Sequence, residues 1–415
     1  MRCVAIFATR IAYVAHGCLT SQPTPGQRSR RDSPSDKEPT IIVTPVGDVV
    51  DVVTLGESMV TFLPSRPGRL ADVPSFDRGI GGAESNVACG LAAAGHAVKW
   101  VSRIGSDGFG QHLVERIAAL GVDTSAVQVD PARPTGIYFR TAGERAFTPG
   151  AGDPHGPDVI EGADGAAEAG GAPLSEVVYY RAGSAASAMS SANMPGDEIR
   201  SGRVLHLSGI TAALSDDCLG LLRDLTSPRA RRPLVSFDVN YRVDLWRDRP
   251  EAGATLLGLA RRSDLVFVGS DEAEAAWGVT GGPTAIRALL PEPRLLVVKD
   301  GGRGVTVFEG EGEGEGQGES VTHVPALRVD VVAHVGAGDA FAAGFLSATL
   351  RGLPVRDRIR HGHLMAAAAL TVPGDLAAPP ARGHADRLVA LDDDAWGTLR
   401  LGPGWTRAPE EVRTP

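Results

Sequence analysis

Lysine and paired cysteines are scarce in this chain of 415 residues, and both shortages narrow its possible functions. Only Lys37, Lys99 and Lys299 occur, so arginine carries nearly all of the positive charge. The net charge is −9 and the body of the chain has no basic block, which gives no support for nucleic acid as a partner. The four cysteines form no C-x-x-C pair, which argues against a zinc site or disulfide framework and favours a reduced, cytoplasmic setting.

Long apolar runs are also absent, so the sequence predicts no membrane association. The apolar stretch from Val4 to Val14 is interrupted by Arg10 and is too short to span a bilayer. Residues 21–40 are rich in serine, proline and arginine, as disordered segments are. We therefore expect residues 1–48 to form a disordered N-terminal extension rather than an export signal.

Two nucleotide-binding motifs are missing as well. No G-x-x-x-x-G-K-[ST] run occurs, because no glycine directly precedes a lysine. No clean G-x-G-x-x-G follows the first expected strand, which weakens the case for a dinucleotide-binding protein.

The pattern that is present is an alternation of strands and helices. Apolar strands are expected at 49–55 and 98–104 and helices at 87–94 and 111–120, and the alternation resumes after residue 203. This order predicts an α/β fold with a doubly wound, mostly parallel sheet over residues 49–391. Between the two halves, strands within about 59–80 and 134–183 predict a small β lid with a flexible insert at about 146–173, and residues 392–415 are expected to be an irregular tail.

One turn combines glycines with a carboxylate. Gly336-Ala337-Gly338-Asp339 lies between an expected strand at 327–332 and an expected helix at 340–350. Glycines let backbone N–H groups approach a ligand, and a helix start favours an anion such as phosphate. From the residues alone, Asp339 is either a helix cap or a base.

Polar side chains also occur where other expected strands end. Ligands bind at the carboxyl edge of doubly wound sheets, so these side chains are candidate ligand-binding residues. Tyr138 and Arg140 share one strand face, and Arg242 follows another strand. An exposed strand face and a surface charge are the simpler interpretations, but a tyrosine with two arginines also suits a sugar that bears a carboxylate. Asn86 could be a helix cap. His361 and His363 have the wrong spacing for a metal pair on one helix face.

Two segments carry a resemblance to a known family. Gly81-Gly82-Ala83-Glu84-Ser85-Asn86, followed by residues 105–110, resembles the first signature of the ribokinase-like (PfkB-type) carbohydrate kinases, and residues 336–341 resemble the second. Within that family the chain is most similar to 2-keto-3-deoxygluconate kinases, through the segments at 56–59, 135–140, 179–185, 206–210 and 238–242. The resemblance covers about residues 51–381 and implies a three-layer α/β/α ribokinase-like fold.

The resemblance also implies a role for each matching residue. It makes Asp339 the base that deprotonates the sugar hydroxyl, with Gly336, Ala337 and Gly338 as the anion hole for the transferring phosphate. The implied sugar-binding residues are Gly82, Ala83, Glu84, Asn86, Tyr138, Arg140, Arg242 and Asp375. The implied ATP-binding residues, besides the anion hole, are Asn240, Lys299, Gly301, Gly302 and Gly304. Glu272 matches an acidic residue that organises Mg²⁺.

The sequence departs from the family pattern at two places. Ala333 and His334 replace residues of which one is often a carboxylate in a monovalent cation site, so activation by potassium stays open. Gly269 replaces an asparagine three residues before Glu272. The implied activity is ATP-dependent phosphorylation of a primary hydroxyl of a sugar acid, and lid pairing in the family implies a homo-oligomer. A kinase for a neutral sugar or a nucleoside, or a non-catalytic sugar-binding homologue, stays open.

Overall fold

The computed structural model describes residues 50–66, 68–141, 177–247, 249–310 and 318–407. The expected N-terminal extension and the expected flexible insert at 146–173 lie outside these ranges. A large sheet has the strand order β14-β13-β12-β11-β10-β9-β1-β4. Its strands are β1 Val52–Leu55, β4 Val98–Val101, β9 Val204–Ser208, β10 Leu234–Asp238, β11 Leu265–Gly269, β12 Leu295–Lys299, β13 Val305–Glu309 and β14 Ser320–Val324.

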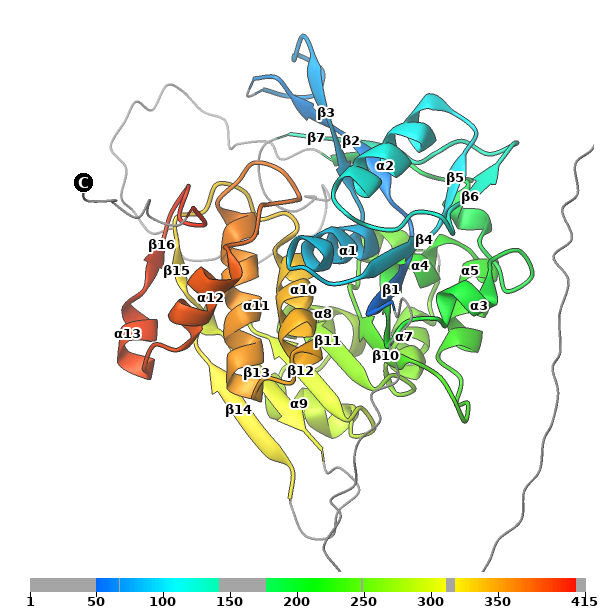
Figure 1. The fold of residues 1–415 in the computed structure, drawn as a ribbon. Coiled ribbons are helices and arrows are strands. Elements are labelled where there is room, and N and C mark those ends of the chain that lie inside the picture. The colour runs from blue at the N-terminus through cyan, green and yellow to red at the C-terminus, as the bar shows by residue number, and fades with distance from the viewer. Residues whose placement is uncertain (1–49, 67, 142–176, 248, 311–317, 408–415) are drawn as a thin grey trace, which may run out of the picture. The chain divides into compact units, whose positions relative to one another are not determined.

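The large sheet is parallel from β4 to β12, and β13 and β14 add an antiparallel edge. Its parallel strands are buried on both faces, which explains their continuous apolar sequences. The chain adds β4 on one side of β1 and then β9 to β12 on its other side, so the direction of winding reverses at β1, as in a doubly wound fold. The structure therefore confirms the expected α/β architecture (Figure 1).

Helices cover both faces of this sheet, and each face has its own apolar core. The first core includes residues of α1 Ala83–Ala93, α2 Gly108–Ala119, α10 Ala337–Leu350, α11 Val355–Leu370, α12 Arg382–Val389 and α13 Asp393–Thr398. The second includes residues of α3 Gly196–Ile199, α4 Gly209–Leu214, α5 Asp216–Leu225, α6 Val243–Trp246, α7 Ala252–Ala260, α8 Ser270–Trp277 and α9 Gly282–Leu289. Two short 3₁₀ turns are η1 Ala186–Ala188 and η2 Gly301–Arg303.

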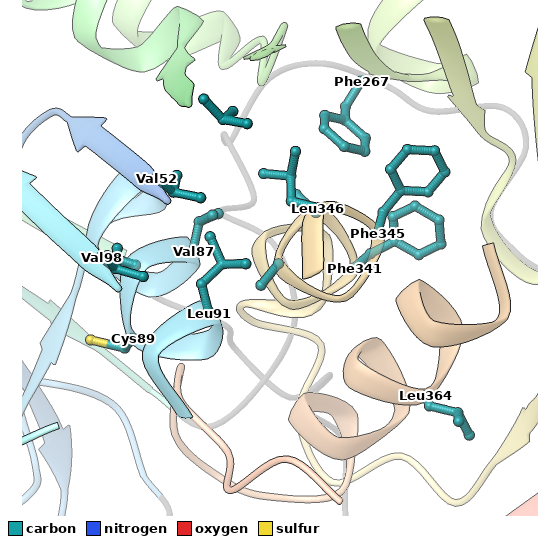
Figure 2. Packing of buried hydrophobic residues seen from close by; sticks show 14 of the residues in the cluster. Val52, Val87, Cys89, Leu91, Val98, Phe267, Phe341, Phe345, Leu346 and Leu364 are labelled. Carbon is teal, nitrogen blue, oxygen red and sulfur yellow. The ribbon is translucent and has the colours of Figure 1, made fainter. Parts of the chain in front are cut away.

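Helix α10 is buried in the first core. Phe341 and Phe345 on α10 pack edge-on against Phe267 of β11, with ring centroids 6.4 and 5.5 Å apart (Figure 2). Val87 and Leu91 of α1 lie on the other side of α10 in the same cluster. Because large aromatic side chains bury much apolar surface, this packing fixes where the N-terminus of α10 lies.

A second, four-stranded sheet has the order β3-β2-β7-β8. Its strands are β2 Met59–Pro64, β3 Phe76–Gly81, β7 Ile137–Arg140 and β8 Val177–Tyr180, within the ranges expected for a lid. Strand β2 follows β1 after a short connection, so the two sheets are joined there by residues 56–58. We call this four-stranded element the small sheet.

Two of the expected strands differ from those in the structure. The strand expected at 98–104 is two strands, because the chain leaves the large sheet after β4 and enters β5 Arg103–Gly105, which pairs with β6 Gln128–Asp130. The strand expected at 327–332 is only β15 Arg328–Val329, outside the large sheet.

The tail is not irregular from residue 392. Helix α13 starts there because the Asp392 carboxylate accepts a hydrogen bond from the Ala395 backbone N–H at 2.8 Å. Trp396 is buried beneath the Arg360 guanidinium, and β16 Arg400–Leu401 pairs with β15.

Candidate active site

The glycine turn and the start of α10 form the centre of the candidate site. Gly336 has φ = 76°, and a Cβ there would lie 2.3 Å from the Asp375 carbonyl oxygen. Both the backbone conformation and this contact therefore require glycine. Helix α10 begins at Ala337, so its first backbone N–H groups have no partner within the helix and offer an anion site.

Asp339 lies in the first turn of α10, after the N-cap residue Gly336. Its Oδ2 accepts a hydrogen bond from Asn86 Nδ2 at 2.8 Å. Burial raises the pKa of Asp339 to about 7, although the Asn86 hydrogen bond opposes the rise, and the charge of Asp238 adds to it. A carboxyl group with this pKa suits general-base chemistry near neutral pH better than a role as a helix cap.

Three charged side chains gather at neighbouring strand ends beside this turn. Lys299, the last residue of β12, places Nζ 3.1 and 3.2 Å from the Asp238 carboxylate oxygens at the end of β10. A Cβ on Gly338 would lie 3.6 Å from the same Nζ, so the ammonium group is next to the glycine turn. Glu272 Oε2 accepts from the Gly269 backbone N–H at 2.9 Å. Nothing in the sequence predicts a role for Asp238, although it ends β10 at the start of the family-like segment 238–242.

Tyr138 and Arg140 are buried, so the interpretation of an exposed strand face is wrong. Tyr138 donates from its hydroxyl to Asp375 Oδ2 at 2.7 Å, and Arg140 Nη2 donates to Asp375 Oδ1 at 2.8 Å. Gly81 makes room for this group, because a Cβ there would lie 2.3 Å from the Tyr138 hydroxyl oxygen. The segment around Asp375 thus joins the small sheet to the Gly336 turn.

Asn86, Gly336 and Asp375 also line a cavity of about 20 Å³. Four polar atoms at predicted site residues are buried without a hydrogen-bond partner among the described residues: Glu84 Oε2, Asn86 Oδ1, Arg140 Nε and Asn240 Oδ1. Unpaired buried donors and acceptors are costly, and a bound ligand is one way to satisfy them.

Arg242 differs from Arg140 in its surroundings. Its side chain is 55% exposed, and its Nη1 lies 3.4 Å from Glu272 Oε1. Its charge nevertheless lowers the pKa of Asp339, so it belongs to the same group of charges. The neighbouring Asn240 adopts φ = 42°, which asparagine tolerates better than most residues.

The remaining predicted nucleotide-binding residues lie in one turn. Gly301 and Gly302 lie in η2, which starts two residues after Lys299, and both are exposed, whereas Gly304 is buried. Gly304 has φ = 128° and starts the return into β13. The turn is therefore open to a ligand on the Lys299 side of the glycine turn.

Glu84 lies in the first turn of α1, close enough to Asp339 for the charge of Asp339 to raise its pKa. Its side chain is buried, its Oε1 accepts from Thr211 Oγ1 at 2.6 Å, and a Cβ on Gly56 would lie 2.0 Å from its Cδ. Burial raises the pKa of Glu84 to about 8, while the Thr211 hydrogen bond opposes the rise. Gly82 is the N-cap of α1 and Ala83 is the first residue of the helix, so both lie within one turn of Asn86.

A model of the pfkB family of carbohydrate kinases matches residues 50–154 and 170–382. The chain belongs to the pfkB family. It is 33% identical over 341 residues to a 2-dehydro-3-deoxygluconokinase of Bacillus subtilis, an alignment that covers 80% of this chain and 93% of the relative. A 2-dehydro-3-deoxygluconokinase of Thermoproteus tenax is 30% identical over 348 residues, covering 83% and 96%.

A crystal structure of a PfkB protein from Polaromonas sp. JS666 has the same fold, with a TM-score of 0.64 and 32% identity over 81% of this chain and 99% of the other. In this pfkB kinase the two expected signatures therefore meet in one place, because Asn86 of the first is hydrogen-bonded to Asp339 of the second. Within the described ranges, no helix is both long and apolar enough to cross a membrane.

Proposed function

We propose that this carbohydrate kinase transfers the γ-phosphoryl group of ATP to a primary hydroxyl of a sugar acid, namely from 2-keto-3-deoxygluconate to its 6-phosphate. The observation that carries the proposal is Asp339, a partly buried carboxyl group with a pKa near 7 at the N-terminus of α10. The relatives named 2-dehydro-3-deoxygluconokinase, another name for the same activity, support this choice of substrate.

In the proposed reaction Asp339 removes the proton from the attacking hydroxyl group. Asn86 orients the carboxylate through its 2.8 Å hydrogen bond. The backbone N–H groups at the start of α10 and the ammonium group of Lys299 stabilise the negative charge of the transferring phosphoryl group. Asp238 holds Lys299 in position for this role.

Tyr138 and Arg140 are proposed to contact the acid end of the sugar, together with the more exposed Arg242. Arg140 keeps a buried Nε without a partner among the described residues, so it has a donor to offer. Guanidinium groups match carboxylates in shape and charge, which favours a sugar acid over a neutral sugar. Asp375, which binds both Tyr138 and Arg140, would then set their orientation.

The carboxylates beside Lys299 fit Mg²⁺. Burial raises the pKa of Glu272, Lys299 opposes this, and Asp238 adds to it, so the two carboxylates are close enough to repel. Mg²⁺ is usually held by one or two protein carboxylates together with substrate phosphates. Glu272 and Asp238 would hold the ion, which would neutralise phosphate charge. A side chain at position 269 would crowd these carboxylates, because a Cβ on Gly269 would lie 2.4 Å from Asp271 Oδ1.

We also infer a homo-oligomer formed through the small sheet, and action in the cytoplasm. Strand β8 is an edge strand, and Val178, Tyr179 and Tyr180 are 40, 49 and 62% exposed, as expected of a surface that pairs with a second copy. Cys89 and Cys218 are free and buried, which suits a reducing compartment.

A sugar-dependent ADP-release assay tests the proposal. The purified protein is given ATP and Mg²⁺ with 2-keto-3-deoxygluconate, fructose or ribose. The proposal expects the highest kcat/KM with 2-keto-3-deoxygluconate and a product phosphorylated at O6. A higher kcat/KM with fructose or ribose, or no ADP release with any sugar, would refute it.

A further inference from the structure

Glu57 lies at the junction of the two sheets, in the short connection between β1 and β2. Its side chain is only 1% exposed, although it carries a carboxylate. Two residues that follow β8 in sequence, Arg181 and Ser184, both point to it. A buried carboxylate needs such partners, because charge is costly to remove from water.

Arg181 and Ser184 together bind both oxygens of the Glu57 carboxylate. Arg181 donates to Glu57 Oε2 from Nε at 2.8 Å and from Nη2 at 2.5 Å. Ser184 Oγ donates to the other oxygen, Oε1, at 2.5 Å. The two guanidinium donors converge on one carboxylate oxygen and the Ser184 hydroxyl binds the other, so these donors together hold the Glu57 carboxylate in one orientation.

Glu57 also touches the start of α1. A Cβ on Gly82, the N-cap of α1, would lie 2.3 Å from the Glu57 backbone oxygen. Helix α1 carries Asn86, the partner of Asp339. The backbone of Glu57 is therefore packed against the element that positions the base.

The side chain of Arg181 also contacts the small sheet. Its guanidinium lies over the Tyr179 ring, 5.7 Å from the centroid. Tyr179 pairs with Tyr138 across β8 and β7, and their rings are 5.4 Å apart. Gly136, just before β7, allows the carboxylate close to that strand, because a Cβ there would lie 2.9 Å from Glu57 Oε1.

We propose that Glu57 and Arg181 form a clamp that fixes the small sheet relative to α1 and so sets the distance between the sugar-holding Tyr138 and Arg140 and the base Asp339. Both are positioning residues that act through others. The inference rests on the proposed sugar-binding role of Tyr138 and Arg140. It makes the affinity for the sugar depend on a contact outside the group of residues proposed to touch the sugar.

The clamp predicts a selective defect in sugar binding. Glu57→Gln keeps the shape of the side chain but removes its negative charge and replaces one accepting oxygen with an NH₂ group. Arg181→Met removes the guanidinium donors. We expect each variant to raise the KM for the sugar at least tenfold and to leave the KM for ATP within twofold. The double variant should be no worse than the worse single variant, because both changes break the same contact.

Arg232→Met is the matched control, because Arg232 makes a similar two-bond ion pair with Asp264 just before β11, at the end of the strands opposite the site. It should leave the KM for both substrates within twofold. If Glu57→Gln does not fold, Ser184→Ala removes one contact of the same carboxylate, and we expect a smaller increase in sugar KM.

The outcomes separate this inference from the proposed function. Wild-type turnover across the sugar panel tests the proposed function, and the clamp is measured with whichever sugar is turned over, or by calorimetric binding if none is. An unchanged sugar affinity in the Glu57 or Ser184 variant, an equal loss for ATP and sugar, or additive effects in the double variant would overturn the clamp.

Discussion

Glu84→Gln tests the buried carboxyl group beneath Gly56. Glutamine has nearly the same shape and keeps an oxygen that can accept from Thr211, but it cannot ionise. Burial raises the pKa of Glu84 from 4.5 to about 8. The wild-type protein should therefore lose stability relative to the variant over a defined range of pH.

The direction of the stability change with pH follows from the protonation of Glu84 in the folded and unfolded states. Between pH 4.5 and 8 the folded protein keeps the Glu84 proton, whereas the unfolded chain has lost it, so folding becomes less favourable as pH rises. A difference of roughly 3.5 pH units, at about 1.4 kcal/mol each, corresponds to about 5 kcal/mol across the whole range. At pH 4.5 and below, this contribution is fully present. It is lost progressively as pH rises toward 8.

Urea unfolding at pH 5, 6, 7 and 8 measures the effect, with tryptophan fluorescence and far-ultraviolet circular dichroism as separate probes. The wild-type midpoint should fall with pH relative to the Glu84→Gln midpoint. Asp339 also has a raised pKa, but it is present in both proteins, so the difference between them reports Glu84 together with its interaction with Asp339. Parallel pH dependences for the two proteins would show that Glu84 is ionised in the folded state, against the burial argument.

Two further substitutions test the glycine turn and the acid-binding residues. Gly336→Ala should cost at least about 1–2 kcal/mol from its left-handed backbone and should nearly abolish activity, because the new Cβ would displace Asp375. Gly352→Ala is its control in thermal unfolding and ADP release, since Gly352 has φ = 70° but no atom within 4 Å of a new Cβ, and equal activity losses would contradict the account. Arg242→Ala should reduce the preference for 2-keto-3-deoxygluconate over fructose by about 0.2–1 kcal/mol in relative kcat/KM, as for an exposed ion pair, because its side chain is 55% exposed. Arg247→Ala, another exposed arginine, should not, and an unchanged preference in Arg242→Ala would refute the role of Arg242.

Much of the fold was predictable because local patterns decide it. Buried strands such as β11 and β12 have continuous apolar sequences, and the alternation with helices indicates a parallel sheet. The tail also contained a signal, an aspartate at 392 before two more acidic residues, which is typical of a helix start. What local patterns could not show is sheet membership, and so the turn from β4 into β5 was missed.

The site was predictable in part. The glycine turn and Asp339 carry a strong local signal, and the structure brings Asn86 to them. Pairs far apart in the chain carry none: Asp238 and Lys299 are separated by 61 residues, and Glu57 and Arg181 by 124. Burial is also invisible in a motif, so the sequence does not show that the Glu84 carboxyl group lies under Gly56 and accepts a hydrogen bond from Thr211.

The most direct test of the central claim is Asp339→Asn, in which asparagine can still accept the Asn86 hydrogen bond. Activity of the wild-type enzyme should rise with pH through about 7, as Asp339 loses its proton and becomes a base. The variant should lose about 10²–10⁴-fold in kcat in the ADP-release assay, while calorimetry shows that it still binds the sugar. A variant that keeps most of the wild-type kcat would contradict the assignment of Asp339 as the base.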